Sequence, residues 1–314
     1  MNNDKVTDFF DDNAEQWVLN GYNEDGYNYP VALHRLRVIK RVLSDFGSNL
    51  KIADLGCGGG NVSLALAELG HDITGIDGAE NMIKLSNSLR STASLELKKR
   101  VNFEHSPITD NNQEDGKFDV CIAMGVIGYF DHDSELFNEV KRLLKPGGIF
   151  LVSCRNQLFN MQSLSFRTEN EINNSNAISL ISEIKSLYSR IPVDKANNMV
   201  EKLRASVTSL PNSIEYDDEK MKSPSEKSID GPSYKPYYEP RQHTPLKLSE
   251  SATLCGFQNI SYHGIHPHLI DPNINKLLPP KIFNQISSCL EVLEDLPISL
   301  TWSSVFVGVF LANN

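Results

Sequence analysis

Short apolar runs alternate with stretches of helical periodicity throughout 51–154, and this alternation restricts the fold more than any other feature of the chain. The apolar runs include KIADLG, DITGID, FDVCIAMG and GGIFLVSC, and amphipathic stretches such as AENMIKLSNSLR separate them. Strands that alternate with helices of about 10 to 15 residues form crossover units around a parallel sheet. The pattern therefore predicts an α/β core over 49–154.

The segments before and after this core have a different texture. A helix is predicted over 31–46, within an N-terminal segment that spans 1–48. Apolar spacing predicts two amphipathic helices in the polar segment 155–245. The apolar faces of these two helices consist of Ile178, Ile181, Ile184 and Leu187, and of Met199, Leu203, Val207 and Leu210.

Strand and helix patterns return over 246–314. The stretch LKLSESATLCGF predicts a helix that ends at Gly256, FQNISYHG predicts a strand, and SSVFVGVFLAN predicts a final strand. A second insertion, 265–297, separates these two strands and is expected to contain a helix around 282–293. The histidine-rich run HGIHPH (263–268) is predicted to form the turn that leads into this insertion.

Charge and apolar content exclude several classes of protein. The chain has 30 Lys and Arg against 40 Asp and Glu, a net charge of −10, so its average surface repels a phosphate backbone and no nucleic-acid partner is expected. The longest apolar run, 305–312, is far shorter than the roughly 20 residues that cross a bilayer. We therefore expect a cytoplasmic protein without a membrane partner. The 5 cysteines include no CxxC pair, which predicts reduced thiols.

A glycine-rich turn, DLGCGGG (54–60), lies between the first predicted strand and the first helix of the core. Glycines in this position let the backbone approach a ligand closely and offer amide donors at a helix N-terminus. The pyridine-dinucleotide fingerprint GxGxxG fails, because Asn61 stands where its third glycine would be. Asp77 ends the second strand, where a carboxylate can accept both hydroxyls of a ribose. The spacing predicts an adenosine-bearing ligand.

Four motifs in succession resemble those of the class I S-adenosylmethionine-dependent methyltransferases: DLGCGGG, GIDGAENM, FDVCIAMGVIGYF and EVKRLLKPGGIFLVS. The resemblance covers about residues 50–155, resumes in LSESATLCGFQNI and closes with the last strand. It implies a Rossmann-like sheet of seven strands with helices on both faces, and S-adenosylmethionine as the cofactor. It also implies transfer of a methyl group, by direct displacement, to an O or N atom of a small-molecule acceptor. The extra segment 155–245 would form a mainly helical lid.

The same resemblance implies roles for the residues around the glycine turn. Asp54 would orient the turn, and Asp77 with Gly78 would hold the ribose. The residues that would lie against the methionine part of the cofactor are Gly56, Cys57 and Gly58.

On the adenine side, Met82 would pack against the base. The family commonly has an acid after the third strand that accepts from the adenine amino group, but this chain has FEHSPI (103–108) there. The Ser106 hydroxyl or the backbone of Ile108 would therefore take that role.

Two further groups would enclose the cofactor. Met124 and Gly125 would line the far side of the pocket. Aromatic residues of the N-terminal segment, including Trp17 and Tyr22, would cover the sulfonium, where rings gain cation–π attraction and exclude water.

A general base is needed only if the acceptor is a weakly acidic hydroxyl or a protonated amine. Its candidates lie where the carboxyl ends of parallel strands meet the ligand crevice, or just before the penultimate helix. They are Tyr129, His243, His266 and His268. Structural hydrogen bonding is the alternative role for these histidines. A metal is not expected, because no acidic partner set accompanies HGIHPH.

Three other functions compete with small-molecule methyl transfer. A nucleic-acid or protein methyltransferase is disfavoured by the acidic charge and by the lack of a (D/N)PPY-type motif after the fourth strand. A non-catalytic module that binds S-adenosylmethionine would keep the same cofactor residues. An NAD-dependent oxidoreductase is a weaker rival.

Overall fold

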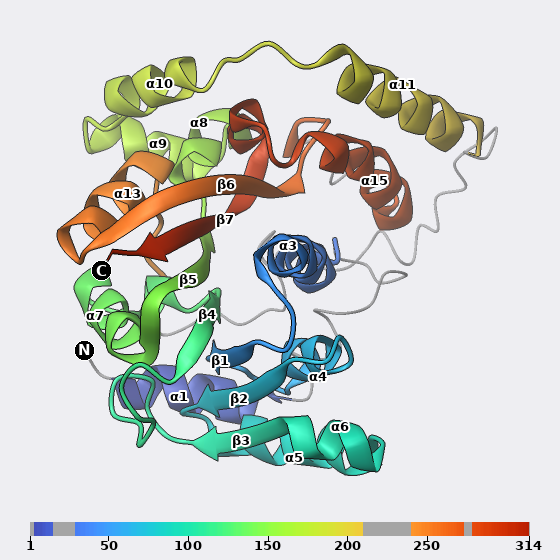
Figure 1. The fold of residues 1–314 in the computed structure, drawn as a ribbon. Helices are drawn as coiled ribbons and strands as arrows, with labels where there is room; N and C mark the ends of the chain where they lie inside the picture. Colours follow the sequence, from blue (N-terminus) through green and yellow to red (C-terminus); the bar gives the residue numbers. More distant parts are fainter. Residues whose placement is uncertain (1–2, 15–28, 210–239, 273–277, 314) are drawn as a thin grey trace.

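A seven-stranded sheet organises the fold in the order β3-β2-β1-β4-β5-β7-β6 (Figure 1). The computed structural model describes residues 3–14, 29–209, 240–272 and 278–313. β7 runs antiparallel to its neighbours β5 and β6, and the other pairs are parallel. The strands are β1 Lys51–Leu55, β2 Asp72–Asp77, β3 Val101–His105, β4 Phe118–Met124, β5 Leu144–Arg155, β6 Phe257–Pro267 and β7 Ser303–Ala312. The predicted seven-stranded α/β architecture is confirmed.

Helices cover both faces of the sheet (Figure 1). The α-helices of the core are α1 Asn3–Asp12, α3 Val31–Phe46, α4 Asn61–Ala67, α5 Glu80–Thr92, α6 Leu95–Arg100, α7 Asp133–Leu143 and α13 Pro245–Leu254. On one face α3 packs Ile39 and Leu43 onto the sheet, and on the other α7 and α13 pack Phe137 and Leu248. The helix predicted over 31–46 is confirmed as α3.

The two insertions add the remaining helices. These are α8 Asn160–Ser163, α9 Phe166–Asn173, α10 Ala177–Ser186, α11 Val193–Thr208 and α15 Pro280–Ser287, with the 3₁₀ helices η1 Ile127–Tyr129, η2 Gln157–Phe159, η3 Ser288–Leu293 and η4 Pro297–Thr301. α8 and α10 pack on η2 at the end of β5, and α11 packs on η3 and α15. The segment 210–239 lies outside the described residues, so the lid function stays a prediction.

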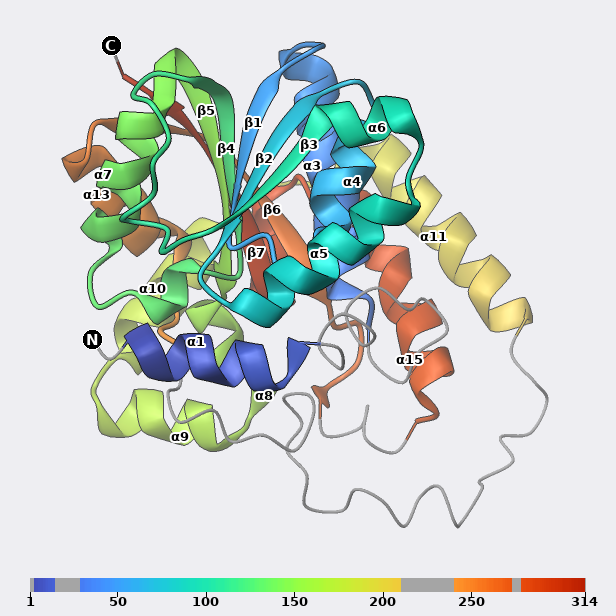
Figure 2. The ribbon, with the colours of Figure 1, turned by 90° about the horizontal axis from the view of Figure 1, so that it is seen from below.

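The strand order reverses between β1 and β4, and open α/β sheets bind ligands at the carboxyl edge beside such a reversal. Figure 2 shows α1 lying across this edge. The backbone N–H of Asn81, in α5, donates to the Asp11 carboxylate of α1 at 2.5 Å. The N-terminal helix therefore lies against the expected ligand crevice.

Two predictions of local structure were wrong. HGIHPH does not form a turn, because β6 continues to Pro267 and pairs Ile265 with Val305 of β7. In α10, Leu180 is buried while Ile178 and Ile181 of the predicted face are 81% and 54% exposed, although Leu187 of that face packs against the core. The sequence AISLISEIKS carries apolar residues on both sides of the helix, so spacing alone could not select the face that packs on η2 and α8.

The described cysteines are all free, and four of the five are buried, as predicted for reduced thiols. None of the helices in the described ranges is long and apolar enough to cross a membrane.

Candidate cofactor and acceptor site

The glycine turn between β1 and α4 has a backbone that other residues would not tolerate. Gly56 has φ +73° and Gly60 has φ +79°. A Cβ on Gly56 would lie 2.5 Å from Cγ2 of Val126, and a Cβ on Gly60 would lie 2.6 Å from Cζ of Phe103. The amides of Gly56 and Cys57 donate to the Ile76 carbonyl at 2.8 and 3.1 Å. The turn is thus pinned to the end of β2 and lies against the loop after β4.

Asp77 connects the glycine turn to α5. One oxygen of its carboxylate accepts the N–H of Gly58 at 2.8 Å, and the other accepts the N–H of Ala79 at 2.9 Å. Burial raises the pKa of Asp77, and these two amide hydrogen bonds oppose the rise. Each carboxylate oxygen can accept more than one hydrogen bond, so the carboxylate retains capacity for the hydroxyls of a ribose.

Asp54 lies deeper than Asp77, with 3% of its surface exposed. Its carboxylate accepts the Ser63 hydroxyl of α4 at 2.6 Å, which ties β1 to the helix that follows the turn. Burial raises the pKa of Asp54 to about 7, the Ser63 hydrogen bond opposes this rise, and the charge of Asp77 adds to it.

The predicted adenine side contains a small apolar cluster. Met82 is 1% exposed and packs with Ala14, Ala79 and Phe10. A Cβ on Gly58 would lie 3.8 Å from the Met82 sulfur, so Met82 adjoins the glycine turn.

The residues after β3 lie at the edge of this region. The Ser106 hydroxyl donates to Glu104 at 3.1 Å, and its amide donates to the Asp77 carbonyl at 3.1 Å. Ile108 packs against the apolar core, and its carbonyl accepts from Asn111. The adenine contacts of Ser106 and Ile108 stay predictions. Gly78 faces α1, because a Cβ there would lie 3.5 Å from Thr7 Oγ1.

Arg35 of α3 closes the far side of the predicted pocket. Gly125 has φ +81°, and a Cβ on it would lie 3.3 Å from Nη1 of Arg35. Met124 packs on the apolar core beside it. Arg35 was not anticipated from sequence, because a basic residue in a helix has the same local pattern whether it faces solvent or a ligand.

Tyr129 stands beside the same basic group. Its ring meets the edge of Phe10 at 5.4 Å. Burial raises the pKa of Tyr129, and the charges of Arg155 and Arg35 oppose that rise. Trp17 and Tyr22 lie outside the described residues.

His266 and His268 lie in a row of rings at the carboxyl end of β6. The His266 ring stacks on Tyr29 at 4.5 Å and 16°, and it lies 4.4 Å from the His268 ring. His268 in turn lies 4.5 Å from Phe159 and 5.4 Å from Phe283. Burial lowers the pKa of His268 to about 4 and also lowers the pKa of His266. Both imidazoles are therefore neutral at pH 7.

The two ring nitrogens of His266 have different surroundings. Nδ1 lies 2.9 Å from the Ser304 hydroxyl. Within the described ranges, Nε2 makes no hydrogen bond. His266 therefore offers one nitrogen that is held and one that can take a proton.

His243 has a different setting from the other candidate bases. It is buried, and its Nε2 lies 2.8 Å from the Asp133 carboxylate, which also accepts from Arg241 at 2.6 Å. Burial raises the pKa of Asp133, but the hydrogen bond and charge of His243 outweigh burial. The pKa of Asp133 therefore lies well below its usual range. These contacts fasten the segment before α13 to the start of α7. No group of three His, Cys, Asp or Glu residues suited to a metal occurs in the described part of the chain.

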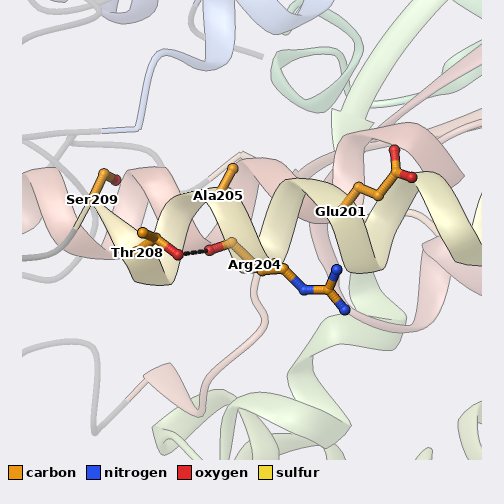
Figure 3. A pocket seen from close by; sticks show the side chains of 5 residues that line it. All are labelled: Glu201, Arg204, Ala205, Thr208 and Ser209. Carbon is orange, nitrogen blue, oxygen red and sulfur yellow. Dashed lines mark hydrogen bonds between the residues drawn. The ribbon is translucent and has the colours of Figure 1, made fainter.

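A shallow pocket on α11 lies apart from this site (Figure 3). It is lined by Glu201, Arg204, Ala205, Thr208 and Ser209. All five belong to one helix or its end, and none contributes to the carboxyl edge of the sheet.

The chain is similar to known methyltransferases in sequence. A methyltransferase-domain family model matches residues 46–205. A ubiquinone biosynthesis O-methyltransferase from Hydrogenovibrio crunogenus is 27% identical over 172 residues, which cover 51% of this chain and 70% of that protein. A protein of the same name from Caulobacter vibrioides is 32% identical over 116 residues, 37% of this chain and 45% of the relative. The chain thus spans less than half of the second relative.

Solved structures share the fold at low sequence identity. A Listeria monocytogenes protein described as an S-adenosylmethionine-dependent methyltransferase has a TM-score of 0.50 and 17% identity, with 90% of this chain and 98% of that chain covered. The cyclase SpnF has a TM-score of 0.53 and 14% identity, with 98% and 95% covered. The family model spans just over half of the chain and includes the glycine turn, Asp77 and Gly125. The chain therefore belongs to the class I S-adenosylmethionine-dependent methyltransferases, and S-adenosylmethionine is its cofactor.

Proposed function

We propose that this protein methylates an O or N atom of a small-molecule acceptor by direct displacement. One observation carries the proposal. The carboxyl edge that holds the glycine turn and Asp77 also holds His266, a neutral imidazole with one nitrogen engaged and the other open.

Bound S-adenosylmethionine supplies an electrophilic methyl group on its sulfonium. The protein's share of the reaction is to align the acceptor and to keep water out. Asp77 and the glycine turn fix the cofactor end of this alignment. His266 then donates from Nδ1 to the Ser304 hydroxyl and accepts the acceptor's proton at Nε2.

A small molecule is the acceptor class best supported. The named relatives act in ubiquinone biosynthesis as O-methyltransferases, which makes hydroxylated phenols the first acceptors to test. The net charge of −10 disfavours a nucleic acid. The uncharged aromatic rings of Tyr29, Phe159, His266 and His268 favour a flat organic molecule as the acceptor.

The experiment is a turnover assay with methyl-labelled S-adenosylmethionine and a panel of catechols, phenols and amines. Acceptor-dependent release of S-adenosylhomocysteine, with the label on the acceptor, supports the proposal. Tight cofactor binding in calorimetry without transfer to any acceptor would favour a binding module instead. SpnF, which shares the fold, is named a cyclase, so the assay must detect the labelled methyl group on the product and not only consumption of the acceptor.

The proposed base has its own test. His266→Ala should lower kcat by about 10²-fold or more, while the Kd for S-adenosylmethionine stays within about twofold of the parent. His132→Ala removes an exposed histidine at the start of α7 and serves as the control. Normal turnover by His266→Ala would reject it as the base and move the search to His268, Tyr129 and His243.

A further inference from the structure

A row of buried polar side chains joins α3 to η3 beside His266. The Tyr29 hydroxyl bridges Nδ1 of His34, at 2.9 Å, and a carboxylate oxygen of Glu291. Nε2 of His34 contacts the carboxylate of Glu294. Tyr29, His34 and Glu294 are 5%, 0% and 8% exposed. Polar groups this deeply buried are costly unless each has a partner, so the row holds one geometry.

Two arginines of α3 complete the row from the solvent side. Arg37 donates to Glu291 at 2.8 Å, and Arg41 donates to Glu294. Burial raises the pKa of Glu294, but the hydrogen bond and charge of His34, with the charge of Arg41, outweigh this and lower it. The Glu294 carboxylate is thus ionised and paired at neutral pH.

The row ends on His266. The Tyr29 ring stacks on the His266 ring, and the His266 backbone N–H lies 3.4 Å from Nδ1 of His34. His266 has φ +56°, a conformation that residues other than glycine rarely adopt. Such a residue persists only where its surroundings hold it, and residues of this kind cluster at functional sites.

We propose that Tyr29 and His34 are positioning residues for His266. Anchored by Glu291 and Glu294, they hold its backbone in the left-handed conformation and its ring in the orientation that accepts the acceptor's proton. They act through His266 and do not take the proton themselves. The inference rests on the proposed function, because it presupposes His266 as the base.

The test compares Tyr29→Phe and His34→Leu with Tyr262→Phe. Tyr262 is another tyrosine with two hydrogen-bond partners, the Ser249 hydroxyl and the Pro245 carbonyl, both at 2.7 Å, but it lies under α13 on the opposite face of the sheet. Tyr29→Phe and His34→Leu should lower kcat by about tenfold or more, with KM and cofactor Kd near those of the parent. His34→Gln, which keeps a donor and an acceptor, should recover part of the loss. A kcat for both variants equal to that of Tyr262→Phe would overturn the proposal.

A second measurement needs no turnover. The His266 imidazole can be followed by NMR in the cofactor-free protein and assigned by its loss in His266→Ala. His268, His34 and Arg35 are the charged or titratable groups that, with burial, lower its pKa. Loosening the row admits water, so the His266 titration midpoint should rise in Tyr29→Phe but not in Tyr262→Phe. His34→Leu is not used in this measurement, because loss of the His34 charge would by itself raise the midpoint.

The two readouts separate the possible failures. If the parent shows no methyl transfer, the proposed function fails, and an unchanged NMR midpoint would also overturn the positioning role. If methyl transfer occurs but His266→Ala turns over normally, methyl transfer stands and the positioning role in catalysis is rejected. A fall in kcat together with a raised midpoint supports the inference.

Discussion

Asp54 carries a buried carboxyl group directly beneath the glycine turn. Its pKa rises to about 7 in the folded protein because of burial, against an ordinary 3.8. Between these two values the folded state binds a proton that the unfolded state has released. The stability contributed by this group is therefore fully present below about pH 3.8 and is lost as the pH rises towards 7.

Asp54→Asn should accordingly raise the melting temperature of the cofactor-free protein, and by more at pH 8 than at pH 5, because Asn cannot ionise. Thermal unfolding at both pH values measures this. Asp110→Asn, at an exposed position, is the control and should show no such growth with pH. An equal gain for Asp54→Asn at pH 5 and pH 8 would contradict the raised pKa.

Arg35 presents its guanidinium beside Gly125, close to the turn that the family resemblance assigns to the methionine part of the cofactor. We expect it to bind the cofactor carboxylate, and charged hydrogen bonds contribute roughly 1.5 to 3 kcal/mol. Arg35→Gln should therefore weaken S-adenosylmethionine about tenfold or more in calorimetry. It should leave the affinity for decarboxylated S-adenosylmethionine unchanged.

Arg37→Gln, two positions along α3 and solvent-exposed, is the control for this binding experiment. Equal weakening of both cofactors by Arg35→Gln would assign Arg35 a structural role.

Local sequence predicted some of these residues and not others. Asp54, Asp77 and the glycines share a short stretch or a regular spacing, so pattern alone identifies them. Arg35, Tyr29 and His34 acquire their surroundings from β4, β6 and η3, more than 80 positions away in every case. Such contacts depend on tertiary packing and leave no local signal.

The glycine turn is the element whose geometry is most demanding. Gly56→Ala would combine a left-handed backbone, which costs an L-residue about 1 to 2 kcal/mol, with a 2.5 Å clash against Val126. It should lower the free energy of unfolding by about 2 kcal/mol or more in urea titration, and it should weaken cofactor binding.

Gly147→Ala separates strain from clash. Gly147 has a nearly identical φ of +74°, but nothing lies within 4 Å of its would-be Cβ. This variant should lose only the backbone contribution and keep its cofactor affinity. If Gly56→Ala and Gly147→Ala lower the free energy of unfolding equally, the Val126 side chain moves away from the new Cβ at no energetic cost.

Helices and strands were predictable where the apolar spacing was compatible with only one element type and one buried face. α3 lies between Pro30 and Gly47, and the Thr244 side chain caps the start of α13, so both helices follow their predicted ranges closely. β6 extends beyond the strand predicted from its sequence, because its last residues pair with β7. The sequence of β6 alone does not indicate this pairing. The buried side of α10 was set by its neighbours rather than by its own sequence.

At the scale of the whole molecule, α1 packs on α5 and α3 lies against the end of β4, and we propose that these two helices cover the cofactor from both sides. Cofactor binding should therefore slow amide hydrogen exchange in α1 and in the glycine turn, because bridging these elements suppresses local opening. The amides of α11, which packs on η3 and α15, should exchange at unchanged rates. If the amide exchange rates in α1 are the same with and without S-adenosylhomocysteine, this helix does not cover the cofactor.

At this scale the four motifs were enough to predict a seven-stranded sheet, because they resemble those of a family whose members have such a sheet. The packing of the helices in the two insertions was not predictable, because it depends on tertiary contacts such as those of α11 with η3 and α15. That these insertions bind the acceptor stays a prediction.

The position of β7 has a consequence for how the chain is made. β7 follows β6 in sequence yet lies between β5 and β6, so β6 has no strand partner until β7 has left the ribosome. Until then the nascent chain displays the open edge of β5 and an unpaired β6, and open strand edges are templates for aggregation. Synthesis that halts between these two strands would leave a product that chaperones must shield or proteases must remove.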